Sequence, residues 1–226
     1  MKPFVENIIL GFGAEAIYSF VIIICSLMIY FGTKELYELS SYKGIKYFRQ
    51  AFLFFAIAYF FRSVIKFIII YFNLQRIFEF NPMYIGAFTL FAFMYFSFIA
   101  IFYLVYSMMW KKWNNSNRIY FLHFIAFIVS VFITISNNIF VYAVVNLFFF
   151  VIISIILYFA YYQHKNKKKE SNLYLTYMLL FIFWMLNIIN ILIPNFLQKI
   201  QLFIYLISLW IFLLILYKTL KKTGST

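Results

Sequence analysis

Hydrophobic residues fall into seven long runs along this chain, separated by short polar segments. The runs cover residues 8–31, 51–72, 83–109, 119–136, 139–162, 173–193 and 200–217. Each is about 18 residues or longer, the length that a helix needs to cross a bilayer. The runs show no alternation of period two, which excludes a transmembrane barrel with a polar lumen. Because helices then remain the way to satisfy the backbone in lipid, we predict an all-α, polytopic membrane protein with one seven-helix domain over residues 1–226.

Basic residues are concentrated on one side of the predicted bundle, and this asymmetry predicts the orientation. Lys2, Arg76 and Lys199 lie on the side of the N-terminus. The opposite side carries most of the 19 lysine and arginine residues, namely Lys34, Lys43, Lys46, Arg49, Lys111, Lys112, Arg118, Lys165, Lys167, Lys168, Lys169, Lys218, Lys221 and Lys222. Since cytoplasmic loops are enriched in such residues, we expect the N-terminus outside, the C-terminus in the cytoplasm, and a multi-pass protein of the cell membrane.

The loops also explain the net charge of +13, so the charge gives no reason to expect a nucleic-acid partner. The lipid bilayer is the expected partner. The cluster Lys165–Lys169 favours anionic lipid, at about 1 kcal/mol per basic residue, although setting the topology is the simpler interpretation. The first run is too long for the apolar region of a removable signal peptide, so we expect it to be retained.

Polar residues recur at a similar depth in several predicted spans, and they form our candidate ligand-binding set. The residues are Glu15, Arg62, Lys66, Asn146, Asn187 and Asn190. At about 1.5 Å per residue, most lie roughly 10 Å below the outer ends of their helices, and Arg62 lies near mid-membrane at about 15 Å. Ionisable groups inside a membrane span are costly, and they indicate either a functional site or a structural pair.

Two interpretations of this polar layer are open. In the first, Glu15 neutralises Arg62 or Lys66, and the asparagine amides satisfy one another between helices. In the second, the layer is an outward-facing pocket whose surplus positive charge receives an anionic or strongly polar ligand.

The chain lacks the residue patterns of common catalytic and metal sites. It has two histidines and one cysteine, far apart in the sequence, and no HExxH, GxSxG or GxxxxGK[ST] pattern. No predicted span carries a pair of carboxylates. We therefore expect no enzymatic activity, no metal and no cofactor.

The first cytoplasmic loop mixes both signs of charge, whereas the other inner loops are almost purely basic. Lys34, Glu35, Glu38, Lys46 and Arg49 are the residues that we assign to it as a candidate docking surface for a cytoplasmic or membrane protein. The simpler interpretation is a solvated helical hairpin held by local pairs such as Lys34 with Glu38, four residues apart.

The same loop carries the resemblance of this chain to a known family. Residues 33–62, TKELYELSSYKGIKYFRQAFLFFAIAYFFR, resemble a segment of a family of uncharacterised archaeal seven-helix membrane proteins. Such proteins are also similar to the seven-helix input regions of archaeal sensor kinases. The resemblance implies lineage and architecture, and it implies no activity.

These observations favour a non-enzymatic receptor or sensor with a polar, net-positive site in the outer half of the bundle. Short helix connections and spans unbroken by proline or glycine argue for this class over secondary transporters, whose helices are often discontinuous. A small transporter or channel that uses Arg62, Lys66 and Glu15 is the alternative. A structural membrane subunit without a ligand is the third possibility.

Overall fold

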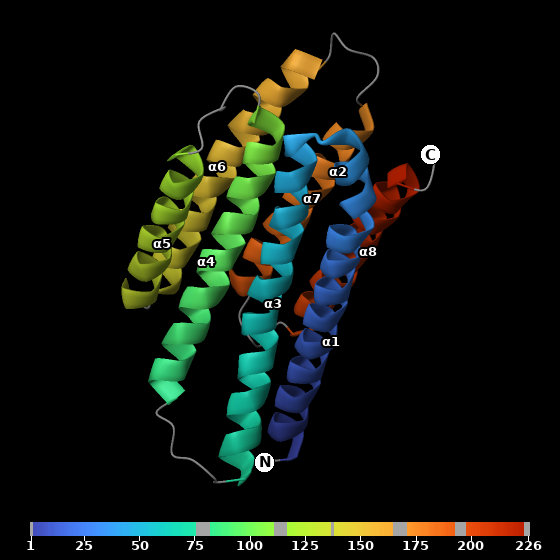
Figure 1. Ribbon diagram of the computed structural model, residues 1–226. Coiled ribbons are helices and arrows are strands. Elements are labelled where there is room, and N and C mark those ends of the chain that lie inside the picture. Colours follow the sequence, from blue (N-terminus) through green and yellow to red (C-terminus); the bar gives the residue numbers. More distant parts are fainter. Residues whose placement is uncertain are drawn as a thin grey trace.

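The computed structural model describes residues 2–75, 82–110, 117–136, 138–164, 171–192 and 198–223, and its elements in these ranges are all α-helices (Figure 1). One helix is short, α2 (Lys34–Ser40). The long helices are α1 (Lys2–Gly32), α3 (Lys43–Gln75), α4 (Pro82–Met109), α5 (Asn117–Ser136), α6 (Ile139–His164), α7 (Ser171–Leu192) and α8 (Gln198–Thr223). The predicted all-α class is therefore confirmed, and each long helix coincides with one hydrophobic run.

The helices of the structure differ most in length from the predicted hydrophobic runs at α3 and α8. Helix α3 begins at Lys43, well before the apolar run at residue 51, and α8 continues to Thr223, beyond the end of the run at residue 217. Hydropathy marks the part of a helix that suits hydrocarbon, whereas backbone hydrogen bonding can continue the helix past that boundary.

Four described segments are long and apolar enough to cross a membrane, namely Gly13–Ser40, Gly86–Met109, Arg118–Ser136 and Ile200–Lys221. Shorter apolar segments lie on α6 and α7, at Phe140–Val151 and Leu175–Leu186. This composition is that of a helical membrane protein. Crossing by all seven long helices, and the direction of the termini, stay predictions.

Helix α3 has a central position because it packs against both α1 and α4. Helix α8 packs against α1 and α7, α5 packs on α4, and α6 packs mainly on α7. Helix α1 begins at one end of the bundle and α8 ends at the other (Figure 1). The core between the helices is aromatic, with Phe183 and Phe212 at a centroid distance of 4.8 Å.

A close approach of two backbones joins α3 to α4 at one end of the bundle. A Cβ atom on Gly44 would lie 3.0 Å from the carbonyl oxygen of Ser107 and 3.1 Å from the Trp110 ring. Ala51 and Ala58 follow Gly44 at seven-residue intervals, which keeps them near the same helix face, and both are fully buried. We refer to Gly44, Ala51 and Ala58 as the small-residue seam of α3. Small residues let membrane helices approach closely.

Candidate functional site

An ion pair between α1 and α3 lies at the centre of the polar layer predicted from the sequence. Arg62 Nε donates to Glu15 Oε1 at 3.0 Å. The side chain of Arg62 is 8% exposed and that of Glu15 is 18% exposed. Glu15 and Arg62 meet because α1 and α3 pack side by side. This is the pairing described by the first of the two interpretations of the polar layer, with Arg62 as the cation.

The guanidinium group of Arg62 is only partly engaged by this pair. Among the described residues, its Nη1 atom is buried and has no hydrogen-bond partner. The guanidinium carbon lies 5.4 Å from the centroid of the Phe93 ring and 5.8 Å from that of Tyr59. These cation–π contacts offset part of the cost of burying the charge, but they do not replace a hydrogen-bond acceptor.

Tyrosines from several helices surround the ion pair. The hydroxyl oxygens of Tyr18 and Tyr59 lie 3.4 Å apart, and the rings of Tyr18 and Tyr205 are 4.6 Å apart. The site therefore draws on α1, α3, α4 and α8, and it combines one buried cation, one carboxylate and phenolic hydroxyls.

Sequence reasoning missed these tyrosines because the chain has 20 of them and composition does not single out any one. A local signal was present in the spacing. Tyr18 follows Glu15 by three residues and Tyr59 precedes Arg62 by three, so each lies one turn from an ionisable residue on the same helix side.

Of the three asparagines predicted for the polar layer, the structure describes the side chain of Asn146. Asn146 is 2% exposed, and its Nδ2 atom donates to the backbone oxygen of Tyr142 on its own helix at 2.8 Å. The side chains of Lys66, Asn187 and Asn190 lie outside the described ones, as does the cluster Lys165–Lys169. The expected network of amides between helices is thus not part of the described site.

Other buried polar atoms also lack partners within the described part of the chain: Ser19 Oγ, Ser26 Oγ, Trp110 Nε1 and Ser208 Oγ. Ser19 lies one turn from Glu15 on α1, on the same helix face. In these ranges, no cluster of three or more histidine, cysteine, aspartate or glutamate side chains could hold a metal ion.

A second polar group, centred on His123 of α5, was not singled out by the sequence. His123 Nδ1 lies 3.2 Å from the hydroxyl of Tyr95, and Nε2 lies 3.0 Å from that of Tyr103. Both tyrosines belong to α4, so the histidine ring forms a polar clasp between α4 and α5.

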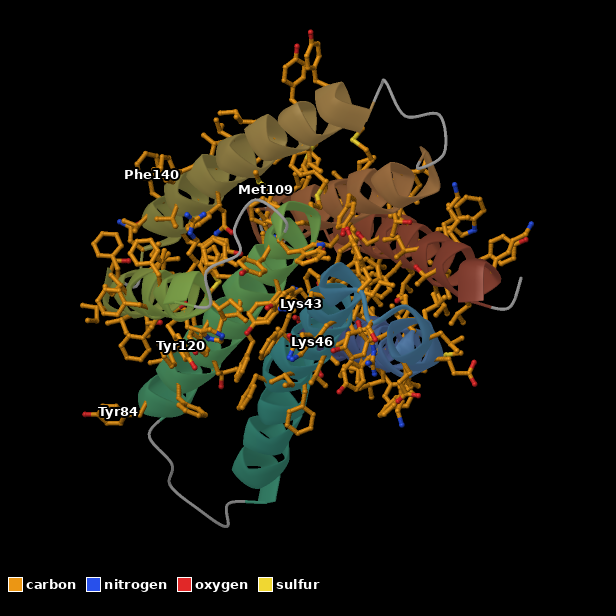
Figure 2. The ribbon with its side chains drawn as sticks, turned by 45° about the horizontal axis from the view of Figure 1, so that its top comes forward. Lys43, Lys46, Tyr84, Met109, Tyr120 and Phe140 are labelled. Atoms are coloured by element: carbon orange, nitrogen blue, oxygen red, sulfur yellow. The ribbon has the colours of Figure 1, made fainter. Side chains whose placement is uncertain are left out.

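The candidate docking surface contains residues of two kinds. Lys34 and Glu38 form an exposed ion pair at 3.7 Å, and Glu35 and Lys46 are exposed as well. Arg49 differs, because its Nε donates to the backbone oxygen of Tyr30 at 3.0 Å and its guanidinium lies over the Tyr30 ring. Figure 2 shows Lys46 beside Lys43 on α3. A docking role stays a prediction, and Arg49 contributes to the packing of α3 on α1.

A small apolar cavity of about 40 Å³ lies between α3, α4, α6 and α7. Its lining includes Phe55, Ile101, Val105, Leu157, Leu180 and Trp184. The cavity offers almost no polar surface, so it is separate in chemistry from the site around Arg62.

Comparison with known proteins found one informative relative. The chain is 29% identical over 212 residues to an uncharacterised protein of Archaeoglobus fulgidus, and the match covers 93% of this chain and 92% of the relative. This fits the archaeal lineage suggested by residues 33–62 and gives no support to the likeness with sensor-kinase input regions. No family model matches the chain. No solved structure matches it.

Proposed function

We propose that this protein is a non-enzymatic membrane receptor or sensor whose ligand binds at Arg62, between α1, α3 and α4. One observation carries the proposal: the guanidinium is buried, yet its Nη1 atom has no acceptor among the described residues. A buried donor without a partner costs about 1–3 kcal/mol, and more when it is charged. A ligand that supplies the acceptor would remove that cost.

Two further features support a receptor over a transporter. Helices α1, α3 and α4 are each continuous through the described residues, whereas secondary transporters often bind substrate at broken helices. The short helix α2 also presents exposed charges of both signs, Lys34, Glu35 and Glu38, outside the apolar part of the bundle. Such a surface suits a protein that passes a signal to a partner.

The proposal is tested by comparing wild type with the double variant Glu15→Gln/Arg62→Met. Replacing both members of a buried ion pair is often neutral for stability, so the double variant is expected to fold. The thermal unfolding of both proteins in detergent is measured in the presence of each member of a library of small polar molecules. We expect at least one molecule to raise the melting temperature of wild type and to leave the double variant unchanged.

The same molecule is then tested for uptake into proteoliposomes. Stabilisation without uptake supports the receptor. Uptake that depends on Arg62 would instead support the small transporter, and the absence of any Arg62-dependent ligand would favour the structural subunit.

A further inference from the structure

We infer that the ligand of this site is a small carboxylate, and that Glu15 occupies the place of the ligand on Arg62 until it binds. This inference rests on the proposed function, because it names the chemical class that the Arg62 site receives. In this arrangement Glu15 is a tethered competitor, and ligand binding exchanges one carboxylate for another.

The geometry of the ion pair is the first argument. A guanidinium group is a planar fork of N–H donors that matches a carboxylate with two parallel hydrogen bonds. Glu15 makes one charge-assisted bond to this fork, from Nε to Oε1. The Nη1 end has no partner among the described residues. A carboxylate that is free to orient itself can use two donors of the fork, so it matches Arg62 better than Glu15 does.

Charge balance is the second argument, and it explains why Glu15 must leave. The described pair carries one positive and one negative charge, and it is largely buried. A second carboxylate beside the first would leave a net negative charge in a poorly hydrated site, which is strongly unfavourable. Glu15 is the more exposed member of the pair, at 18% against 8%, so it is the group that can move toward water.

The rings beside Arg62 are the third argument. The guanidinium carbon lies 5.4 Å from the centroid of the Phe93 ring and 5.8 Å from that of Tyr59. These rings provide an apolar wall for the body of the ligand, which suits a carboxylate that carries a flat apolar group.

The test uses benzoate as the probe, because it joins a carboxylate to a flat apolar ring, and benzamide as its neutral counterpart. Benzoate binding to the full chain in detergent is measured by thermal shift and by isothermal titration. The key variant is Glu15→Gln, which removes the competitor. Its matched control is Glu38→Gln, an exposed glutamate on α2 that also forms an ion pair.

We expect the dissociation constant for benzoate to fall about tenfold in Glu15→Gln, because binding no longer pays for displacing a carboxylate that occupies the site most of the time. Glu38→Gln should match wild type, and benzamide should bind neither protein. The double variant Glu15→Gln/Arg62→Met should lose benzoate binding while remaining folded.

Three results would overturn the inference: benzoate affinity unchanged by Glu15→Gln, equal binding of benzamide, or benzoate binding by the double variant. If a ligand of a different chemical class binds in an Arg62-dependent way, the inference of a carboxylate ligand is wrong, whereas the proposed receptor function is still supported. If benzoate binds as expected and is also transported, the inference of a carboxylate ligand is supported, but the proposed receptor function is wrong.

Discussion

Two polar contacts between helices each depend on one side chain, that of Arg62 or that of His123. Both side chains lie where a polar group without a hydrogen-bond partner is costly. Arg62 joins α3 to Glu15 of α1, and His123 joins α5 to Tyr95 and Tyr103 of α4. A neutral imidazole has one N–H donor and one acceptor nitrogen, so one tyrosine donates to the ring and the other accepts. Both ring nitrogens are thereby satisfied.

At this scale we predict that His123→Phe lowers the free energy of unfolding by about 1–3 kcal/mol, because it leaves two tyrosine hydroxyls without their partner. The triple variant His123→Phe/Tyr95→Phe/Tyr103→Phe should regain most of the loss, since all members of the polar group are then apolar. Tyr120→Phe, at an exposed position of the same helix, is the control. Chemical unfolding in detergent measures the effect, and an unaffected His123→Phe would show that the clasp does not stabilise α5.

Neighbouring helices are held together chiefly by the close packing of their side chains. Lipid chains are as apolar as the helix faces, so the hydrophobic effect adds little. Between α3 and α4, Gly44 of the small-residue seam lies close to the backbone of Ser107. Between α3, α4, α6 and α7, by contrast, the apolar cavity shows that packing is incomplete. The two regions predict opposite responses to added volume.

In the close region, Gly44→Ala should destabilise the protein by about 1–3 kcal/mol, because the new Cβ would press against the Tyr42 ring as well as the carbonyl oxygen of Ser107 and the Trp110 ring. Gly86→Ala is the matched control, since no atom lies within 4 Å of that position. There the same change should stabilise by about 0.5–1 kcal/mol through helix propensity. Thermal unfolding of the two variants checks the contrast, and equal behaviour would mean that α3 and α4 are not in close contact at Gly44.

In the cavity, Val105→Ile should stabilise the protein by up to about 1 kcal/mol, given about 24 cal/mol per Å³ of cavity removed. Leu180→Ala should instead destabilise by about 2–5 kcal/mol, because it enlarges the cavity. Val144→Ile adds the same methylene at an exposed position of α6 and should have little effect. Midpoints of unfolding measure these changes. A clearly destabilising Val105→Ile would show that there is no space for the added methylene at this position.

At the scale of the whole molecule, the charge distribution predicts how the bundle is oriented in the membrane. Figure 2 shows Tyr84 at the start of α4 and Met109 at its other end, with Lys43 of α3 nearby. The charge distribution predicts that the Lys43 end is cytoplasmic. Tyr84 is 73% exposed, so the other helices do not cover it, and it lies at the outer end of the predicted span 83–109.

This orientation predicts a specific labelling pattern. In a Cys25→Ala background, which removes the single cysteine, Tyr84→Cys should react with a membrane-impermeant maleimide in intact cells. Lys43→Cys should react only after the cells are permeabilised. The reverse pattern would place the N-terminus inside, and the Arg62 site would then face the cytoplasm.

Much of the architecture follows from the sequence because the cost of placing a residue in hydrocarbon is a local quantity. Hydropathy alone predicts the seven long helices, and its errors lie at their ends, as where α3 begins at Lys43 instead of residue 51. Counting residues along each run also places Glu15 and Arg62 at depths within about 5 Å of each other, close enough for long side chains to meet, because the rise per residue is constant.

The rest depends on how each helix is rotated and which helix lies beside it. Large apolar side chains occur on both the buried and the exposed faces, as with Phe98, which is 1% exposed, and Phe132, which is 57% exposed. Since lipid and protein core have similar chemistry, the pattern carries little information on rotation. The tyrosines around Arg62, the clasp at His123 and the approach at Gly44 therefore emerge only when the helices pack.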